Sequence, residues 1–137
     1  MKTNQHTHAI SLARKRFNAA ILVRNVDAIC AFFSDDYHIL TAFGIQSQGV
    51  DEQHRRWSRA FQLDPILLYR RRTRELRCNE HLGAAEELGS WVGRFSSKQQ
   101  VSLVAGVYSA KWQRQDNGRW LIQSEVFTML KSKILLT

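Results

Sequence analysis

Two runs of alternating apolar residues joined by a tight-turn signal form the feature that most constrains how this chain folds: GVYSAKWQRQDNGRWLIQSEVF, residues 106–127. Apolar residues at every second position predict strands with one buried face, and Asn117-Gly118 between them predicts a β-hairpin. The pattern also places Glu125 on a face that should be buried. An ionised carboxylate there is costly unless a cation or hydrogen-bond donors accompany it, so the surroundings of Glu125 become the central question.

The rest of the sequence predicts an antiparallel meander preceded by helices. Alternating and β-branched stretches predict four long strands, at residues 66–78, 83–95, 101–115 and 118–130. Ahead of them, apolar residues at helical spacing predict helices at 8–24, 25–34 and 51–63, with a strand at 37–43. This order predicts an α+β fold in which a curved, mostly antiparallel sheet packs around three N-terminal helices.

Size and composition predict a single domain. The chain has 137 residues, of which 44% are hydrophobic, and it lacks a linker rich in proline, glycine or serine. We expect a flexible tail at residues 1–8 and one domain at residues 9–137. Cys30 and Cys78 show no CxxC spacing, and no N-terminal apolar run resembles a signal peptide, so we expect a reduced, cytoplasmic protein without membrane spans.

The formal net charge of +8 raises the question of a nucleic-acid partner. The basic residues are dispersed, however. Arg14, Lys15 and Arg16 fall on the first helix, and five arginines fall on the strand at 66–78, where successive side chains point to opposite faces. We therefore expect a solvated basic surface and no nucleic-acid binding.

The sequence carries no metal or nucleophile motif. It has no HxxxH pair, GxSxG elbow, P-loop or GxGxxG turn, and its five histidines are scattered. His6 and His8 fall in the expected tail. We predict no metal site and no cofactor.

Four motifs, taken in order, carry a resemblance to a known fold: RNVDAICAFFSDDY, Gly49 before the third helix, AAEELGSWVGRF, and the hairpin at residues 106–127. Over residues 10–131 the chain resembles the NTF2-like superfamily, the fold of nuclear transport factor 2 and ketosteroid isomerase, and most closely its SnoaL-like or DUF4440-type branch. The resemblance implies a cone with an apolar cavity open at one end. It also implies a homodimer formed through the outer face of the sheet, where Val107, Trp120, Ile122 and Val126 are expected.

Period-two alternation then indicates which side chains face the implied cavity. Trp91, Tyr108 and Trp112 are expected to form an aromatic wall, with Glu87, Gln123 and Glu125 as polar groups. Arg71 shares its strand face with Tyr69 and Thr73. We expect Arg71 to reach Glu87 or Glu125, and Arg72 to do so if a bulge shifts the register.

Ketosteroid isomerase places a general-base aspartate, a tyrosine and a second aspartate on its cavity wall. By motif position these places correspond here to Thr41, Phe17 and Tyr108. No carboxylate stands at the position of the base, so steroid isomerisation by that mechanism is not expected.

Three functions stay open at this point, because the same fold supports many chemistries. The first is binding of a small apolar or carbonyl-containing molecule, with contacts expected from Phe17, Thr41, Trp57, Arg71, Trp91, Tyr108, Trp112 and Gln123. The second is a cofactor-independent cyclase, isomerase or dehydratase that uses Glu125 or Glu87 as acid or base. The third is a dimerisation or assembly module in which Arg71 and a glutamate form a purely structural pair. An enzyme needs a cavity carboxylate of raised pKa that no arginine neutralises, a binder needs only the cavity, and a module needs neither.

Overall fold

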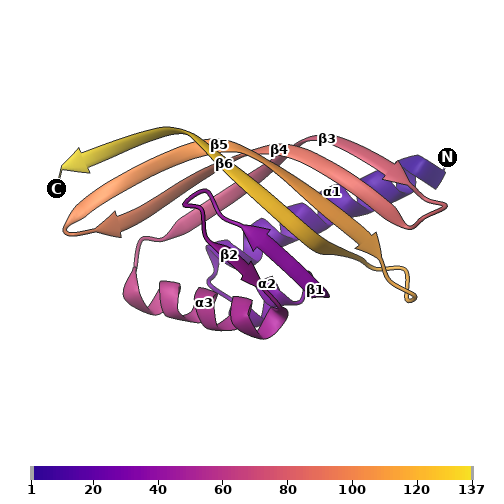
Figure 1. Cartoon of the computed structure of the whole chain (residues 1–137), viewed down its shortest axis with the longest axis horizontal. Helices are drawn as coiled ribbons and strands as arrows, with labels where there is room; N and C mark the ends of the chain where they lie inside the picture. Colours follow the sequence, from indigo (N-terminus) through magenta and orange to yellow (C-terminus); the bar gives the residue numbers. More distant parts are fainter. Residues whose placement is uncertain (1, 137) are drawn as a thin grey trace.

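A strongly curved sheet arches over the helices in the computed structural model of the chain, which describes residues 2–136 and the side chains of residues 5–135 (Figure 1). The elements are α1 (Lys2–Leu22), α2 (Val26–Cys30), β1 (Phe33–Leu40), β2 (Gln46–Gln48), α3 (Val50–Leu63), β3 (Leu68–Asn79), β4 (Ala84–Ser97), β5 (Gln100–Arg114) and β6 (Trp120–Leu136). In the described residues the strand order is β2-β1-β6-β5-β4-β3. All neighbours are antiparallel except β1 and β6, which pair in parallel. The predicted α+β cone is confirmed.

Helix α1 begins at Lys2, so most of the segment expected to be a flexible tail is helical. His6 gives the physical reason. Its ring lies edge-on to Trp120 with 5.5 Å between ring centroids, and its Nδ1 accepts a hydrogen bond from Trp120 Nε1 (3.3 Å). Farther along, Ile10, Phe17 and Ile21 are completely buried on the face toward the sheet, as their spacing predicts.

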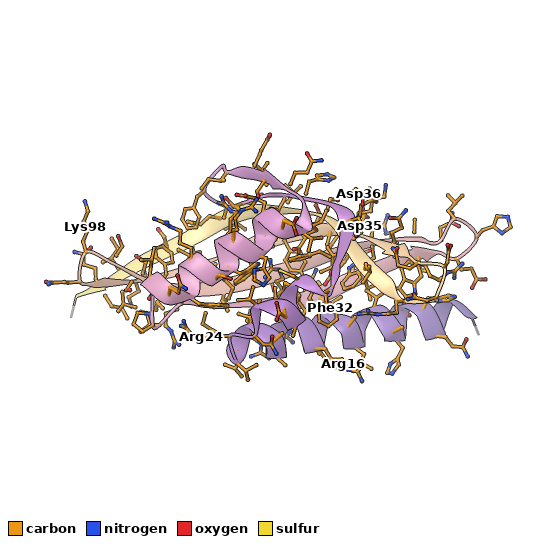
Figure 2. All side chains as sticks on the ribbon, turned by 90° about the horizontal axis from the view of Figure 1, so that it is seen from below. Arg16, Arg24, Phe32, Asp35, Asp36 and Lys98 are labelled. Atoms are coloured by element: carbon orange, nitrogen blue, oxygen red, sulfur yellow. The ribbon has the colours of Figure 1, made fainter. Side chains whose placement is uncertain are left out.

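The second helix is shorter than predicted and the strand after it begins earlier. Helix α2 spans little more than one turn, and the side chain of Asn25 caps its N-terminus. Ile122 donates its amide to the Phe32 carbonyl (2.7 Å), so pairing with β6 starts there. Asp35 and Asp36, which were expected to precede the strand, therefore lie within β1 (Figure 2).

Arg24 ties the end of α1 to the end of α3 (Figure 2). Its backbone adopts a left-handed φ of 58°, which ends the helix. Its guanidinium donates to the carbonyl oxygens of Phe61 (3.2 Å), Asp64 (3.0 Å) and Leu67 (3.1 Å). These bonds satisfy carbonyl groups at the end of α3 and fix that helix below the sheet.

A β-bulge in β6 changes which side chains face the interior. Trp112 pairs with Ile122 and Lys111 pairs with Ser124, so Gln123 has no partner on β5. The extra residue lets both Ile122 and Glu125 point inward, and each is completely buried. Gln123 instead donates a hydrogen bond to Asp36 Oδ2 (2.8 Å) on β1.

The bulge also corrects the expected outer face of the sheet. Trp120 and Ile122 belong to the buried core and not to an exposed interface, because the alternation is interrupted after them. Val107 and Val126 do lie on the outer face, where their side chains are 45% and 43% exposed. The exposed apolar area on the outer face of the sheet is thus smaller than the alternation alone predicts.

Across residues 2–136, none of the helices combines the length and the apolar character needed to span a bilayer. A cytoplasmic location stays a prediction of the sequence.

Candidate functional site

Two arginines and two glutamates from four elements form a buried charge network inside the cone. Arg14 on α1 places its Nη2 2.8 Å from Glu87 Oε1 on β4 and 3.0 Å from Glu125 Oε2 on β6. Arg71 on β3 places its Nε 3.0 Å from Glu125 Oε2. All four side chains are almost fully buried. Because two positive and two negative charges meet, the network as a whole is neutral.

Neutral donors complete the shell around the two carboxylates. Glu87 accepts hydrogen bonds from the Tyr108 hydroxyl, from Trp112 Nε1 (2.9 Å) and from Thr73 Oγ1 (2.7 Å). Glu125 accepts one from the Tyr37 hydroxyl (2.8 Å). These bonds come from positions that share an inward face with the glutamates, so the buried acids replace lost water contacts with protein donors.

The electrostatics keep Glu87 ionised. Burial by itself raises the pKa of Glu87, but the charge of Arg14 and hydrogen bonds from Arg14, Tyr108 and Thr73 outweigh it and lower the pKa to about 2. Burial raises the pKa of Tyr108 well above its ordinary value, and the neighbouring Glu87 raises it further. Glu87 is therefore a fixed anion and Tyr108 a fixed donor at neutral pH.

The structure brings Arg71 to Glu125, one of its two expected partners, and leaves Arg72 exposed. Arg71 donates from Nε and, at 3.3 Å, from Nη2. Asn18 holds its backbone by accepting from Arg71 N (3.0 Å) and donating to Arg71 O (2.7 Å). Arg71 is thus held on both its main chain and its side chain.

Arg14 is the network member that sequence reasoning missed, since it was counted among dispersed surface charges. The sequence does contain a signal that Arg14 is buried. Arg14 follows Ile10 by four residues and precedes Phe17 by three, which places it on the apolar face of α1. Its side chain is only 1% exposed.

Aromatic rings surround the part of Arg14 that no carboxylate contacts. Its Nη1 is buried and has no hydrogen-bond partner among the residues that the structure describes. The guanidinium carbon lies 5.2 to 5.3 Å from the ring centroids of Phe17, Tyr108 and Trp112. Cation–π attraction therefore stabilises this edge in place of a hydrogen bond.

A cavity of about 420 Å³ lies between α3 and the concave side of the sheet. Its walls are mostly aliphatic and aromatic. Lining residues are Ile39, Thr41, Ala42, Phe43, Ile45, Gln53, Arg56, Trp57, Arg59, Ala60, Leu63, Leu67, Tyr69, Arg71, Trp91 and Phe127. None of these is acidic or a histidine, so among the described residues the cavity presents arginines as its charged groups.

The cavity includes some of the expected contact residues and excludes others. Thr41, Trp57, Arg71 and Trp91 line it. The expectation is wrong for Phe17, Tyr108, Trp112, Gln123, Glu87 and Glu125, which do not line it. The bulge turns Gln123 away, and the other five are buried and contact Arg14 where α1 meets the sheet.

Arg71 connects the charge network to the cavity. Its Nε and Nη2 are bound to Glu125, whereas its Nη1 has no hydrogen-bond partner in the described part of the chain. Its guanidinium carbon also lies 4.8 Å from the ring centroid of Phe17 and 4.7 Å from that of Phe127. An arginine held on one edge and lining a cavity with the other can donate to an oxygen atom of a bound molecule.

A second array of polar side chains joins α2 to α3 on the surface. Ser58 Oγ lies 3.5 Å from His54 Nδ1, and His54 Nε2 lies 2.8 Å from Asp27 Oδ1. The Asp27 side chain is 90% exposed and that of His54 is 48% exposed. A catalytic triad needs a shielded acid to orient its histidine, so this array is better explained as a surface contact between two helices.

The described residues contain no group of three or more histidine, cysteine or acidic side chains arranged to hold a metal ion.

No family model matches the sequence, and no curated protein matches it. Solved structures do share its fold. A proposed scytalone dehydratase from Novosphingobium aromaticivorans superposes with a TM-score of 0.84 at 12% identity, covering 99% of this chain and 92% of that one. A ketosteroid isomerase-like protein from Erwinia carotovora gives 0.74 at 15% identity, covering 90% and 95%. An NTF2-like protein of unknown function from Shewanella oneidensis gives 0.71 at 18% identity, covering 89% and 98%. At these identities the likeness establishes the fold.

Proposed function

We propose that this chain, which has the NTF2-like fold, binds a small and largely apolar molecule in the cavity between α3 and the sheet. Arg71 serves as the polar anchor for an oxygen atom of that molecule. The observation that carries the proposal is a cavity of about 420 Å³ with aromatic walls, into which an arginine fixed by Glu125 extends. Pockets of this size with few polar groups are typical of small-molecule sites.

The rigidity of Arg71 favours binding. A free arginine loses considerable rotamer entropy when it grips a ligand. Here Glu125 holds the guanidinium and Asn18 holds the backbone before any ligand arrives. The donor of the anchor is therefore preorganised, and an arriving oxygen acceptor gains a charge-assisted hydrogen bond at little ordering cost.

The enzymatic alternative, a cyclase, isomerase or dehydratase with Glu125 or Glu87 as acid or base, is less well supported. A general acid or base must reach the substrate and titrate near the working pH. Glu87 and Glu125 are completely buried, both contact Arg14, and the pKa of Glu87 is lowered to about 2. This alternative is the second candidate because two structural neighbours are named as a ketosteroid isomerase-like protein and a proposed scytalone dehydratase.

We also propose that the chain forms a homodimer through the outer face of its sheet. Four apolar side chains on this face are exposed by 36% to 54%: Leu88, Val92, Val107 and Val126. The register places them on adjacent strands β4 to β6, so they form a connected patch of the kind that covers an interface. Such a dimer leaves the cavity on the concave side free for a ligand.

A cavity-filling variant tests the binding proposal without disturbing the charge network. Ala60 on α3 lines the cavity, and Ala60→Phe fills part of it. Ala19→Phe is the matched control, since Ala19 is exposed on α1. In a thermal-shift screen of small carbonyl compounds and carboxylic acids, compounds that stabilise the wild type should stabilise Ala19→Phe and not Ala60→Phe. A screen without a single stabilising compound, or equal shifts in both variants, would contradict the proposal.

A further inference from the structure

All charged side chains that line the cavity carry the same sign. They are Arg56 and Arg59 on α3 and Arg71 on β3, and no acidic residue in the described part of the chain joins them. A cavity of otherwise apolar walls with only cationic groups favours one kind of charge in its occupant, because a guanidinium attracts an anion and repels a cation across low-dielectric walls.

Neighbouring acids only weakly neutralise the two arginines of α3 that line the cavity. The nearest acid to Arg56 is Glu52, at 3.9 Å, and Glu52 already binds Arg55 at 2.8 Å. Arg59 has no ion pair or hydrogen bond to any residue described in the structure. Arg71 differs from both, since it belongs to the neutral charge network. The excess positive charge of the cavity therefore lies on its helical wall.

Helix geometry explains why this wall combines charge with apolar surface. Four residues of α3 lie on one face of the helix, because three of them follow Arg56 by three, four and seven residues: Arg59, Ala60 and Leu63. All four line the cavity, whereas the neighbouring Arg55 does not. Opposite them stand the rings of Trp91 and Phe127 from the sheet.

We infer that the ligand is an amphipathic organic anion, with an apolar body between the helix and the sheet and an acidic group next to Arg56 and Arg59. This inference rests on the proposed binding function and specifies its ligand class. A carboxylate or sulfonate can accept paired hydrogen bonds from a planar guanidinium, which a neutral carbonyl compound does more weakly. The remaining Nη1 donor of Arg71 then contacts a polar atom of the body.

The test compares two probes of equal shape, 2-naphthoate and its neutral analogue 2-naphthamide, by titration calorimetry and by quenching of tryptophan fluorescence. At low salt the wild type should bind the carboxylate about fivefold more tightly than the carboxamide, because two partly exposed cations contribute only a modest attraction. This difference in affinity should shrink as salt is added. Arg56→Gln/Arg59→Gln should abolish the difference while changing the affinity for the carboxamide by less than about twofold.

Arg70→Gln/Arg72→Gln is the matched control, because it removes the same total charge from exposed arginines that do not line the cavity and that, among the described residues, have no ion pair with an acid near it. It should keep the preference for the carboxylate. Equal affinities of the wild type for both probes would overturn the inference and leave the binding proposal standing. Equal loss of preference in both double variants would also overturn it, since the net charge of +8 would then account for the preference. No binding of either probe would count against both proposals.

Discussion

Arg14 and Glu87 face each other across the interior of the cone, with Arg14 Nη2 2.8 Å from Glu87 Oε1 and no solvent access to either group. The contact joins α1 to β4, elements that lie 73 residues apart at these positions. The contact therefore holds α1 against the sheet in the buried interior of the cone. Removing one partner leaves the other as an uncompensated charge, which costs more than the pair itself contributes.

We predict that Arg14→Met lowers the free energy of unfolding by about 3 to 5 kcal/mol, the range for breaking a buried ion pair from one side. Arg14→Met/Glu87→Gln removes one charge of each sign and should be less destabilised than the single variant. Urea unfolding of Arg14→Met, Glu87→Gln and the double variant measures the difference. A double variant that loses the sum of both single effects would show that Arg14 and Glu87 do not interact.

Acid should destabilise the protein in a window that Glu87 defines. Its pKa is about 2 in the folded protein and 4.5 for an unperturbed glutamate. Because the folded state binds the proton more weakly than the unfolded chain, Glu87 contributes its full stabilisation above about pH 4.5 and loses it as the pH falls toward 2. The loss is on the order of 3 kcal/mol.

Glu87→Gln isolates this contribution, since glutamine does not titrate. Urea unfolding between pH 5 and pH 2 should show a shallower decline of stability in the variant than in the wild type. Parallel pH profiles would mean that other carboxyl groups cause the acid sensitivity.

The alternation of the hairpin predicts a buried Glu125, the alternation of the strand at 66–78 predicts that Arg71 reaches it, and both expectations agree with the structure. It does not predict the position of Gln123. A bulge adds one residue to a strand without a distinctive composition, so the alternation shifts by one residue at Gln123, between the buried Ile122 and the buried Glu125. Arg14 was missed for another reason: charged residues on helices are usually exposed, and only its position between Ile10 and Phe17 indicates otherwise.

The open part of the cavity could not be derived from strand alternation. Alternation tells which side chains point inward, but it does not tell where the interior is filled. Phe17 and Tyr108 point inward and pack against Arg14, while Trp91 lines the cavity between α3 and the sheet. The distinction depends on how α1 and α3 dock on the sheet, which involves contacts distant in the sequence.

Gly106 should tolerate no side chain, although it lies in the middle of β5. A Cβ there would lie 1.8 Å from the carbonyl oxygen of Thr128 on β6, and backbone cannot move aside as a side chain can. We predict that Gly106→Ala costs 3 kcal/mol or more, roughly the scale of severe overpacking. Gly118→Ala is the control: it has φ of 87° and open space around it, so it should cost only about 1 kcal/mol. Similar melting temperatures for the two variants would contradict the predicted contact.

Arg24 should control the local stability of α3. Arg24→Ala removes three hydrogen bonds to carbonyl groups at and beyond the end of that helix. We expect faster amide hydrogen exchange in α3 (Val50–Leu63) with little change in β4 and β5. Arg24→Lys should rescue only part of the protection, because a single ammonium group cannot reach all three carbonyl groups with the same geometry. Uniformly faster exchange in all elements would indicate a global effect instead.

The outer face of the sheet yields the last prediction, because it is the surface on which the proposed dimer depends. Val107 and Val126 are 45% and 43% exposed and flank Ser109 on β5, which pairs directly with Val126. Val107→Asp/Val126→Asp places two negative charges in the middle of this patch, and burying carboxylates in an apolar interface costs free energy. Sedimentation velocity should show a dimer for the wild type and a monomer for this variant. Leu12→Asp on α1, at an apolar side chain that is 38% exposed away from the patch, should stay dimeric. A wild type that sediments as a monomer at all concentrations would rule out the dimer, and dissociation of the Leu12→Asp protein would place the interface elsewhere.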